Sequence, residues 1–270
     1  MSSRLLDEDY SQTEENIGKA QHFSLNEERP DYEVLTLEHS METIIPEVGM
    51  QIWSGALLLC DYLIHNHRDL DSSTVLDLGA GTGITSIVAA MFAPHVLCTD
   101  YLASIVELSE RNWERNRDLL SKRSCDQIVF KILDWSSPAA AASESKYTIT
   151  SDDLKFIEDA TLILAAEVIY DEELTDGFFQ TIYNLLMKSP PKTVLLTVER
   201  RIIFSTDNQD ICSPAYEHFL ENLNDLVTVD EGLVYFTSEK MNTTFPLYFQ
   251  YQRVKELELW QITSQICVSP

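Results

Sequence analysis

From Thr74 onwards, strand-like runs alternate with helix-like runs, and this alternation restricts the chain to few folds. The strand-like runs are residues 74–78, 95–100, 127–135, 161–170 and 193–200, and the helix-like runs are 84–92, 102–116 and 171–188. Strands joined by helices of this length form right-handed crossovers. The pattern therefore predicts an α/β protein with a mainly parallel sheet and helices on both faces.

The two ends of the chain carry other patterns. Residues 1–30 are polar and acidic without periodicity, so we expect a disordered or loosely ordered tail before a single domain at 31–270. Apolar and polar residues alternate over 32–40, which predicts a strand of a short N-terminal β-hairpin. The sequence indicates helices at 53–67 and 213–223 and a low-complexity insertion at 136–153. Residues 225–237 and 247–262 are rich in strand formers, which predicts an antiparallel strand pair at the sheet edge.

Charge and cysteine content limit the possible partners. The chain has 19 Lys and Arg residues against 44 Asp and Glu residues, a net charge of −25. Such a field repels nucleic-acid phosphates and attracts basic proteins, so we expect a basic protein partner and no direct nucleic-acid contact. Five cysteines without a C-x-x-C pair fit reduced thiols. We found neither a secretory signal nor a membrane-spanning run, and expect a monomer in the nucleus and cytoplasm.

A glycine-rich turn follows the first of the alternating strands. It reads Asp77-Leu78-Gly79-Ala80-Gly81-Thr82-Gly83, with a helix-like run directly after it. In parallel α/β sheets ligands bind beyond the carboxyl ends of the strands, and glycines let the backbone approach a ligand closely. We interpret the turn as a nucleotide-binding loop; the alternative is a tight turn without a ligand.

The spacing of the turn narrows the choice of nucleotide. A dinucleotide-binding loop has the pattern G-x-G-x-x-G, whereas this chain has G-x-G-x-G followed by Ile84. The carboxylate of Asp77 would repel a diphosphate but accept a hydrogen bond from an ammonium group. S-adenosylmethionine carries an ammonium group and no phosphate. A nicotinamide dehydrogenase is the alternative enzyme of this fold.

Two further strands end in acidic residues. Asp100 ends the second strand and is placed to bind ribose hydroxyls. Asp134 and Trp135 end the third, where the carboxylate could accept from the adenine amine and the indole could cover the ring. A solvated strand-end aspartate is the alternative for Asp100. Together, Asp77, Asp100 and Asp134 predict one cofactor pocket at the carboxyl ends of three strands.

With these residues the chain resembles the seven-β-strand S-adenosylmethionine-dependent methyltransferases, and within them the methyltransferase-like protein lysine methyltransferases. The resemblance spans residues 32–262 and rests on GMQIWSGALLL, LDLGAGTG, CTD, LDW and AAEVIY. It implies a Rossmann-like, seven-stranded, mostly parallel sheet with an antiparallel C-terminal pair. It also implies S-adenosyl-L-methionine as cofactor and a lysine acceptor in a protein, for which we expect a nuclear nucleic-acid-binding protein.

The resemblance also implies roles for individual residues. The residues expected to bind the cofactor are Trp53, Asp77, Gly79, Ala80, Gly81, Gly83, Asp100, Asp134, Trp135 and Ala166. Glu167 and Tyr170 match an acid-x-x-aromatic signature at the acceptor side, where the family more often has Asp than Glu. As alternatives, Trp53 and Tyr170 could be ordinary core residues, and Glu167 could cap the following helix.

Methyl transfer to an amine requires nitrogen, methyl carbon and sulfur in line, so positioning dominates catalysis. We expect Glu167 to attract the lysine ammonium and Tyr170 to line its channel, while water takes the proton.

The histidines of His65-Asn66-His67 do not share a helix face, so we expect no metal site. Asn112 and Asn116, four residues apart, are expected to face solvent. A non-catalytic S-adenosylmethionine-binding scaffold or chaperone-like protein is the alternative function.

Overall fold

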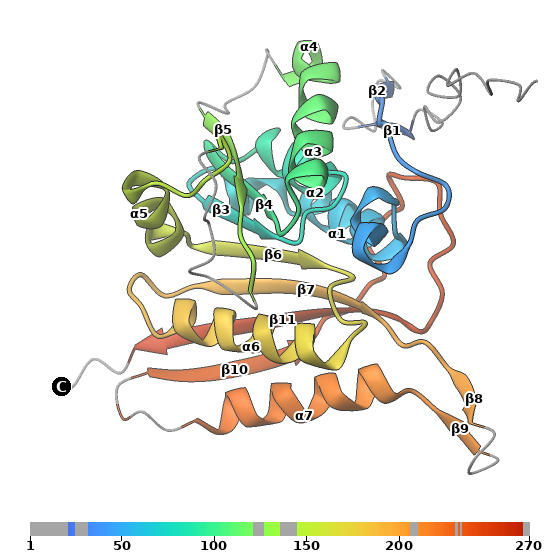
Figure 1. Ribbon diagram of the computed structural model, residues 1–270, viewed down its shortest axis with the longest axis vertical. Helices are drawn as coiled ribbons and strands as arrows, with labels where there is room; N and C mark the ends of the chain where they lie inside the picture. The colour runs from blue at the N-terminus through green and yellow to red at the C-terminus, as the bar shows by residue number, and fades with distance from the viewer. Residues whose placement is uncertain are drawn as a thin grey trace, which may run out of the picture.

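The computed structural model describes residues 21–24, 32–120, 127–135, 145–205, 210–229, 232 and 234–266. Its centre is a seven-stranded sheet in the order β10-β11-β7-β6-β3-β4-β5 (Figure 1). The strands are β3 (Thr74–Leu78), β4 (His95–Asp100), β5 (Gln127–Ile132), β6 (Leu162–Ala166), β7 (Thr193–Glu199), β10 (Val234–Lys240) and β11 (Leu257–Ile266). The neighbours from β5 to β7 pair in parallel, and β11 pairs antiparallel with both β7 and β10. This confirms the predicted sheet and its antiparallel C-terminal pair.

Helices cover both faces of the sheet, as Figure 1 shows. They are α1 (Ser54–His65), α2 (Ile84–Ala90), α3 (Ala103–Arg115), α4 (Arg117–Leu120), α5 (Ser151–Asp159), α6 (Glu172–Leu186) and α7 (Pro214–Thr228). Val75 and Leu76, neighbours in β3, point to opposite faces: Val75 packs in a core with α1 and α2, and Leu76 in a second core with α6 and α7. Two apolar cores thus hold the sheet from both sides.

The chain leaves β3 for β4 on one side and later returns to β6 on the other side of β3. The strand order therefore reverses at β3, and the loops after β3, β4 and β6 diverge at one edge of the sheet. A crevice forms at such a reversal, outside the carboxyl ends of the strands. The topology places the glycine-rich turn there.

Two predicted segments have other bounds in the structure, and one hairpin was not predicted. Helix α5 begins within the last residues of the insertion predicted at 136–153, where Thr150 and Asp153 form a reciprocal capping box, and continues to Asp159. Residues 136–144 lie outside the described residues. Helix α7 continues to Thr228, so the first of the two strand-rich regions, predicted at 225–237, begins later than predicted, with β10 at Val234. A small hairpin, β8 (Ile203–Ser205) with β9 (Asp210–Cys212), was not predicted.

The segment before β11 was predicted as strand but is irregular. The backbone N–H groups of Tyr248 and Phe249 donate to Oδ1 of Asp61, at 2.8 and 3.1 Å, instead of to a neighbouring strand. The other oxygen of Asp61 accepts from the Tyr251 hydroxyl at 2.8 Å and from Nη2 of Arg253 at 2.6 Å. One buried carboxylate on α1 thus organises this segment.

At the N-terminus, β1 (Gln21–Ser24) pairs antiparallel with β2 (Tyr32–Leu35), which confirms the expected hairpin. Strand β1 lies within the tail predicted at residues 1–30, whose residues 1–20 and 25–30 lie outside the described residues. The strand predicted over 32–40 ends at Leu35, because side chains of α3 and its C-cap take over the backbone hydrogen bonds that follow.

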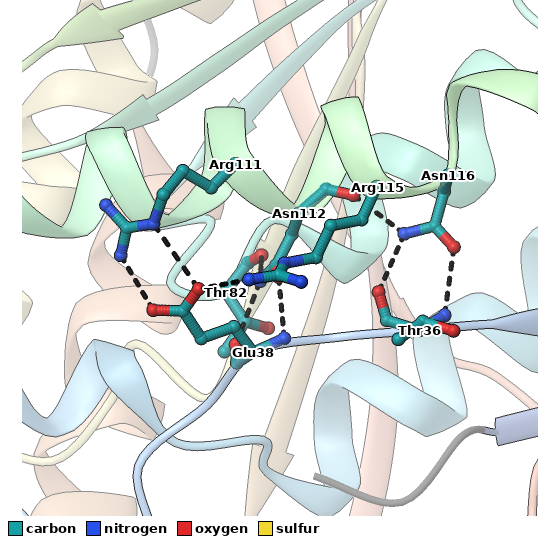
Figure 2. Close-up of polar contacts among 7 residues, drawn as sticks. All are labelled: Thr36, Glu38, Thr82, Arg111, Asn112, Arg115 and Asn116. Atoms are coloured by element: carbon teal, nitrogen blue, oxygen red, sulfur yellow. Dashed lines mark hydrogen bonds and ion pairs between the residues drawn. The ribbon is translucent and has the colours of Figure 1, made fainter. Parts of the chain in front are cut away.

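Asn112 of α3 and Asn116, which caps the end of that helix, make these bonds, as Figure 2 shows. Oδ1 of Asn116 accepts from the Thr36 N–H at 2.9 Å while its Nδ2 donates to the Thr36 carbonyl at 2.9 Å. Asn112 binds Glu38 in the same way, at 2.7 and 3.0 Å. Both side chains are buried, so the expectation that they face solvent was wrong. We call these two asparagines and the segment 36–38 the asparagine clamp.

The segment that follows the clamp contains the helical turn η1 (Ile45–Met50), and a second turn, η2 (His67–Leu70), follows α1. Cys60, Cys98 and Cys212 are free thiols. Cys125 and Cys267 lie outside the described residues. Within the described ranges, no helix has both the length and the apolar character needed to cross a membrane.

Candidate functional site

A cavity of about 270 Å³ opens at the carboxyl ends of β3, β4, β5 and β6. Ten of the twelve predicted site residues line it: Trp53, Gly79, Ala80, Gly81, Asp100, Asp134, Trp135, Ala166, Glu167 and Tyr170. They come from segments far apart in the sequence, with 117 residues between the positions of Trp53 and Tyr170. The structure thus brings together the ends of the three strands on which the cofactor prediction depends.

Gly81 adopts a φ of 56°, a region that favours glycine. A Cβ atom at this position would lie 2.7 Å from the carbonyl oxygen of Gly49. The missing side chain therefore lets the segment after the clamp, with Val48, Gly49 and Gln51, form one wall of the cavity. The sequence did not show that this segment contacts the glycine-rich turn, because the contact depends on the tertiary fold.

Asp100 stands at the end of β4 with its carboxylate against the turn. Oδ2 accepts from the Gly81 N–H at 3.0 Å, and Oδ1 accepts from the Tyr101 N–H at 2.8 Å. Burial raises the pKa of Asp100 to about 6, against these hydrogen bonds, which lower it. Each oxygen keeps a further lone pair, so the carboxylate can still accept from ligand hydroxyl groups.

Asp77 and Gly83 do not line the cavity. Asp77 is fully buried beneath the turn, and its Oδ2 accepts from Oγ1 of Thr85 at 2.5 Å and from Oγ of Ser86 at 2.6 Å. The side chain therefore ties β3 to the first turn of α2, and the direct ligand contact predicted for Asp77 is corrected to a supporting role. Gly83 precedes α2 and packs against Ser109 of α3.

Asp134 and Trp135 follow β5, whose end is held to β4 by the hydrogen bond from the Leu133 N–H to the Asp100 carbonyl, 2.9 Å. The Trp135 ring lies edge-on to Phe178, with centroids 5.4 Å apart. Its Nε1 is buried and has no hydrogen-bond partner among the described residues. Buried donors are nearly always paired, so this one suits a ligand that supplies an acceptor.

Glu167 follows β6 in a strained conformation, with a φ of 58° that few non-glycine residues adopt. Its side chain is only 4% exposed, and Oε1 accepts from the Gly55 N–H at 3.2 Å. A Cβ on Gly55 would lie 2.6 Å from Cγ of Glu167. The longer side chain of Glu fits here because Gly55 has none.

Burial raises the pKa of Glu167 to about 7, although the positive charge of Arg201 opposes the shift. Burial also raises the pKa of Tyr170 to about 12, so this phenol stays neutral. The helix after them is capped by Asp171, whose Oδ1 accepts from the Leu174 N–H at 3.0 Å. Glu167 is therefore not the cap of α6, and its carboxylate is available to the cavity.

Trp53 lines the cavity beside the segment after the clamp. Its Nε1 donates to the Val48 carbonyl at 3.0 Å, which fixes the indole against the wall formed by the segment after the clamp. The guanidinium of Arg201 lies over the Trp53 ring, with Cζ 4.9 Å from the ring centroid. Sequence reasoning did not identify Arg201, because nothing in its local pattern shows that the end of β7 approaches Trp53.

The model of a family described as lysine methyltransferase matches residues 30–226, which is most of the chain. This range includes all the described residues that line the cavity. The chain belongs to the lysine methyltransferase family. The chain is similar to methyltransferase-like protein 22 of mouse, with 35% identity over 238 residues, which are 86% of this chain and 59% of that protein. The human protein of the same name is 35% identical over 237 residues, 87% of this chain and 58% of that protein.

A further relative is the protein N-lysine methyltransferase METTL21A of Xenopus tropicalis. It is 30% identical over 154 residues, which are 57% of this chain and 61% of that protein. The chain therefore spans about three fifths of the length of the curated relatives it matches.

Proposed function

We propose that this chain is an S-adenosylmethionine-dependent protein-lysine N-methyltransferase. The observation that carries the proposal is the charge of the cavity wall. Among the described residues that line the cavity, three are carboxylates, Asp100, Asp134 and Glu167, and none is Lys, Arg or His. Such a wall disfavours a diphosphate, and so the nicotinamide alternative, and favours a nucleoside that carries positive charge.

The cavity residues fit S-adenosylmethionine in three places. Asp100 is placed for the ribose hydroxyls, and Asp134 with Trp135 for the adenine, where the unpartnered Nε1 of Trp135 supplies a donor. The turn from Gly79 to Gly81 and Trp53 would hold the amino-acid end. When bound, this cofactor supplies an activated methyl group on a sulfonium.

The acceptor would reach the methyl group beside Glu167 and Tyr170. Above a pH of about 7 the carboxylate of Glu167 is charged and attracts the lysine ammonium. The apolar surface of Val168 and the neutral ring of Tyr170 disfavour the ammonium, which promotes loss of its proton to water. The strained, buried Glu167 keeps a fixed position, which in-line transfer requires.

The proposed acceptor is a lysine in a basic protein, and we propose a nuclear nucleic-acid-binding protein, with the enzyme acting as a monomer in the nucleus and cytoplasm. The net charge of −25 supports a basic partner, because opposite charge accelerates association. The alternative is a scaffold that binds the cofactor without transferring the methyl group.

Incubation with trideuteromethyl-labelled S-adenosylmethionine and a nuclear lysate, followed by mass spectrometry, tests the proposal. We expect labelled lysine in a small set of basic proteins with the wild type and none with Glu167→Ala, which should still bind the cofactor in a calorimeter. Cofactor binding without transfer by the wild type would support the scaffold. Labelling of a residue other than lysine would reject the assigned acceptor.

A further inference from the structure

Arg201 lies two residues after β7, at the rim of the cavity, and its side chain is 49% exposed. Two residues of the cavity wall converge on its guanidinium. Nη2 lies 3.8 Å from Oε2 of Glu167, and Cζ lies 4.9 Å from the centroid of the Trp53 ring. A carboxylate and an aromatic face that share one cation form a cation-binding arrangement.

The arrangement holds Arg201 only weakly. A separation of 3.8 Å is too long for a hydrogen bond, so the pair is purely electrostatic. Half-exposed ion pairs and exposed cation–π contacts each contribute little, because water and salt compete with them. Glu167 is buried and Trp53 is fixed to Val48, so the seat is built more rigidly than its occupant.

We propose that Trp53 and Glu167 form a seat for a primary alkylammonium group, and that Arg201 occupies this seat until the ammonium of the acceptor displaces it. The inference rests on the proposed function, because that function brings a lysine to Glu167. It moves Trp53 from the cofactor side of the site to the acceptor side, and it makes Arg201 a residue that sets the affinity for the acceptor.

The shapes of the two cations explain why one can replace the other. Arg201 is not among the described residues that line the cavity. Its backbone is held by the neighbouring Arg200, whose N–H donates to the Glu256 carbonyl after the end of β7. The planar guanidinium of Arg201 reaches the seat from the rim. A lysine ammonium is compact and carried on an unbranched stem, so it can enter between Ala56, Val168 and Tyr170, which line the same cavity.

The test is a titration with n-butylammonium, which copies the end of a lysine side chain. The readout is the indole N–H signal of Trp53 in a ¹⁵N–¹H spectrum, assigned with Trp53→Phe. At a pH of about 8.5 the probe remains charged. Arg201 lowers the pKa of Glu167, so its removal raises that pKa above about 7, and the alkaline pH keeps the carboxylate ionised in both proteins.

We expect Arg201→Gln to reach half-saturation at about three- to ten-fold less probe than the wild type, because the seat is then unoccupied. Arg201→Lys, which keeps a resident cation, should titrate close to the wild type. Arg200→Gln is the matched control, since the neighbouring guanidinium lies over Tyr216 instead. Glu167→Gln should show no saturable shift, and uncharged n-butanol should shift none of the proteins.

Half-saturation of Arg201→Gln at the wild-type concentration or above would overturn the proposal, as would a saturable shift in folded Glu167→Gln. Circular dichroism of each variant checks folding. The titration needs neither cofactor nor methyl transfer. A failed methylation assay together with the expected titration would therefore reject the proposed function but retain the seat, and the reverse pair of results would reject the seat alone.

Discussion

Glu167 concentrates several unfavourable features in a single residue: a positive φ, a buried carboxylate and a pKa raised to about 7. Proteins keep such features where the surrounding structure and function require them. The sequence pointed to this position through its acid-x-x-aromatic pattern. It could not show the strain or the contact with Gly55, since both depend on how α1 packs against the end of β6.

The raised pKa of Glu167 makes a prediction about stability. The folded chain binds this proton more tightly than the unfolded chain, whose glutamates titrate near 4.3. The contribution to the free energy of unfolding is therefore full below about pH 4 and is lost as pH rises through about 7. We expect Glu167→Gln to be more stable than the wild type at pH 8, by about 1–3 kcal/mol, and nearly equal at pH 4.

Urea unfolding of both proteins at the two pH values measures this difference. Glu173→Gln, an exposed change on the next helix, is the control and should show no such pH dependence. A stability difference that is equal at both pH values would contradict the assigned pKa.

Asp100 carries the second residue-scale prediction. Asp100→Asn keeps the shape of the side chain but removes its charge and one acceptor oxygen, while Gly81 and Tyr101 both need an acceptor. We expect the affinity for S-adenosylmethionine to fall at least about ten-fold, since hydrogen bonds to charged groups contribute about 1.5–3 kcal/mol each. Calorimetric titration measures it, with exposed Asp71→Asn as control. An unchanged affinity would remove Asp100 from the site.

At the scale of elements, the asparagine clamp replaces a strand. Two side chains of α3 and its C-cap satisfy the backbone of Thr36 and Glu38, and Nδ2 of Asn112 also donates to the Thr82 carbonyl in the glycine-rich turn, at 2.9 Å (Figure 2). The segment they hold continues into the cavity wall around Gly49. Arg111 and Arg115 add exposed ion pairs to Glu38, at 3.0 and 3.1 Å.

Asn116→Ala should cost about 1–3 kcal/mol of stability, because it leaves partly buried backbone groups of Thr36 unpaired. Asn112→Ala should cost as much and also weaken cofactor binding, since it releases the turn at Thr82. Urea unfolding and calorimetry separate the two effects, and hydrogen exchange at the Thr36 and Glu38 amides reports the clamp directly. Arg111→Ala, at an exposed ion pair, should change stability by at most about 1 kcal/mol.

Equal cofactor affinities of the two alanine variants would show that the clamp does not act on the turn through Asn112. Unchanged exchange at both amides would show that the asparagines do not protect this backbone.

The elements that sequence reasoning predicted well are those whose signal is local. Apolar runs such as 74–78 and 95–100 became parallel strands because they are buried on both faces. The clamp and the segment organised by Asp61 were missed, because a polar side chain that replaces a strand partner comes from 74 to 187 residues away. The capping box of α5 was readable from Thr150 and Asp153, but the surrounding low-complexity sequence concealed it.

On the scale of the whole molecule, the net charge of −25 predicts how acceptor proteins are recruited. Long-range attraction is screened by salt over about 8–10 Å, whereas contacts inside the cavity are screened much less. Raising KCl from about 50 to about 300 mM should therefore reduce methyl incorporation into basic lysate proteins several-fold. The affinity for cofactor, measured by calorimetry in the same buffers, is the control and should change little. Salt-independent incorporation would contradict electrostatic recruitment.

The account depends most on the identity of the ligand that fills the cavity at the carboxyl ends of β3, β4, β5 and β6. Calorimetric titration of the full chain with S-adenosylmethionine, and separately with NAD, measures this directly. We predict saturable one-to-one binding of S-adenosylmethionine, weakened in Asp100→Asn, and no detectable heat with NAD. Binding of NAD, or S-adenosylmethionine binding that Asp100→Asn leaves unchanged, would contradict the account.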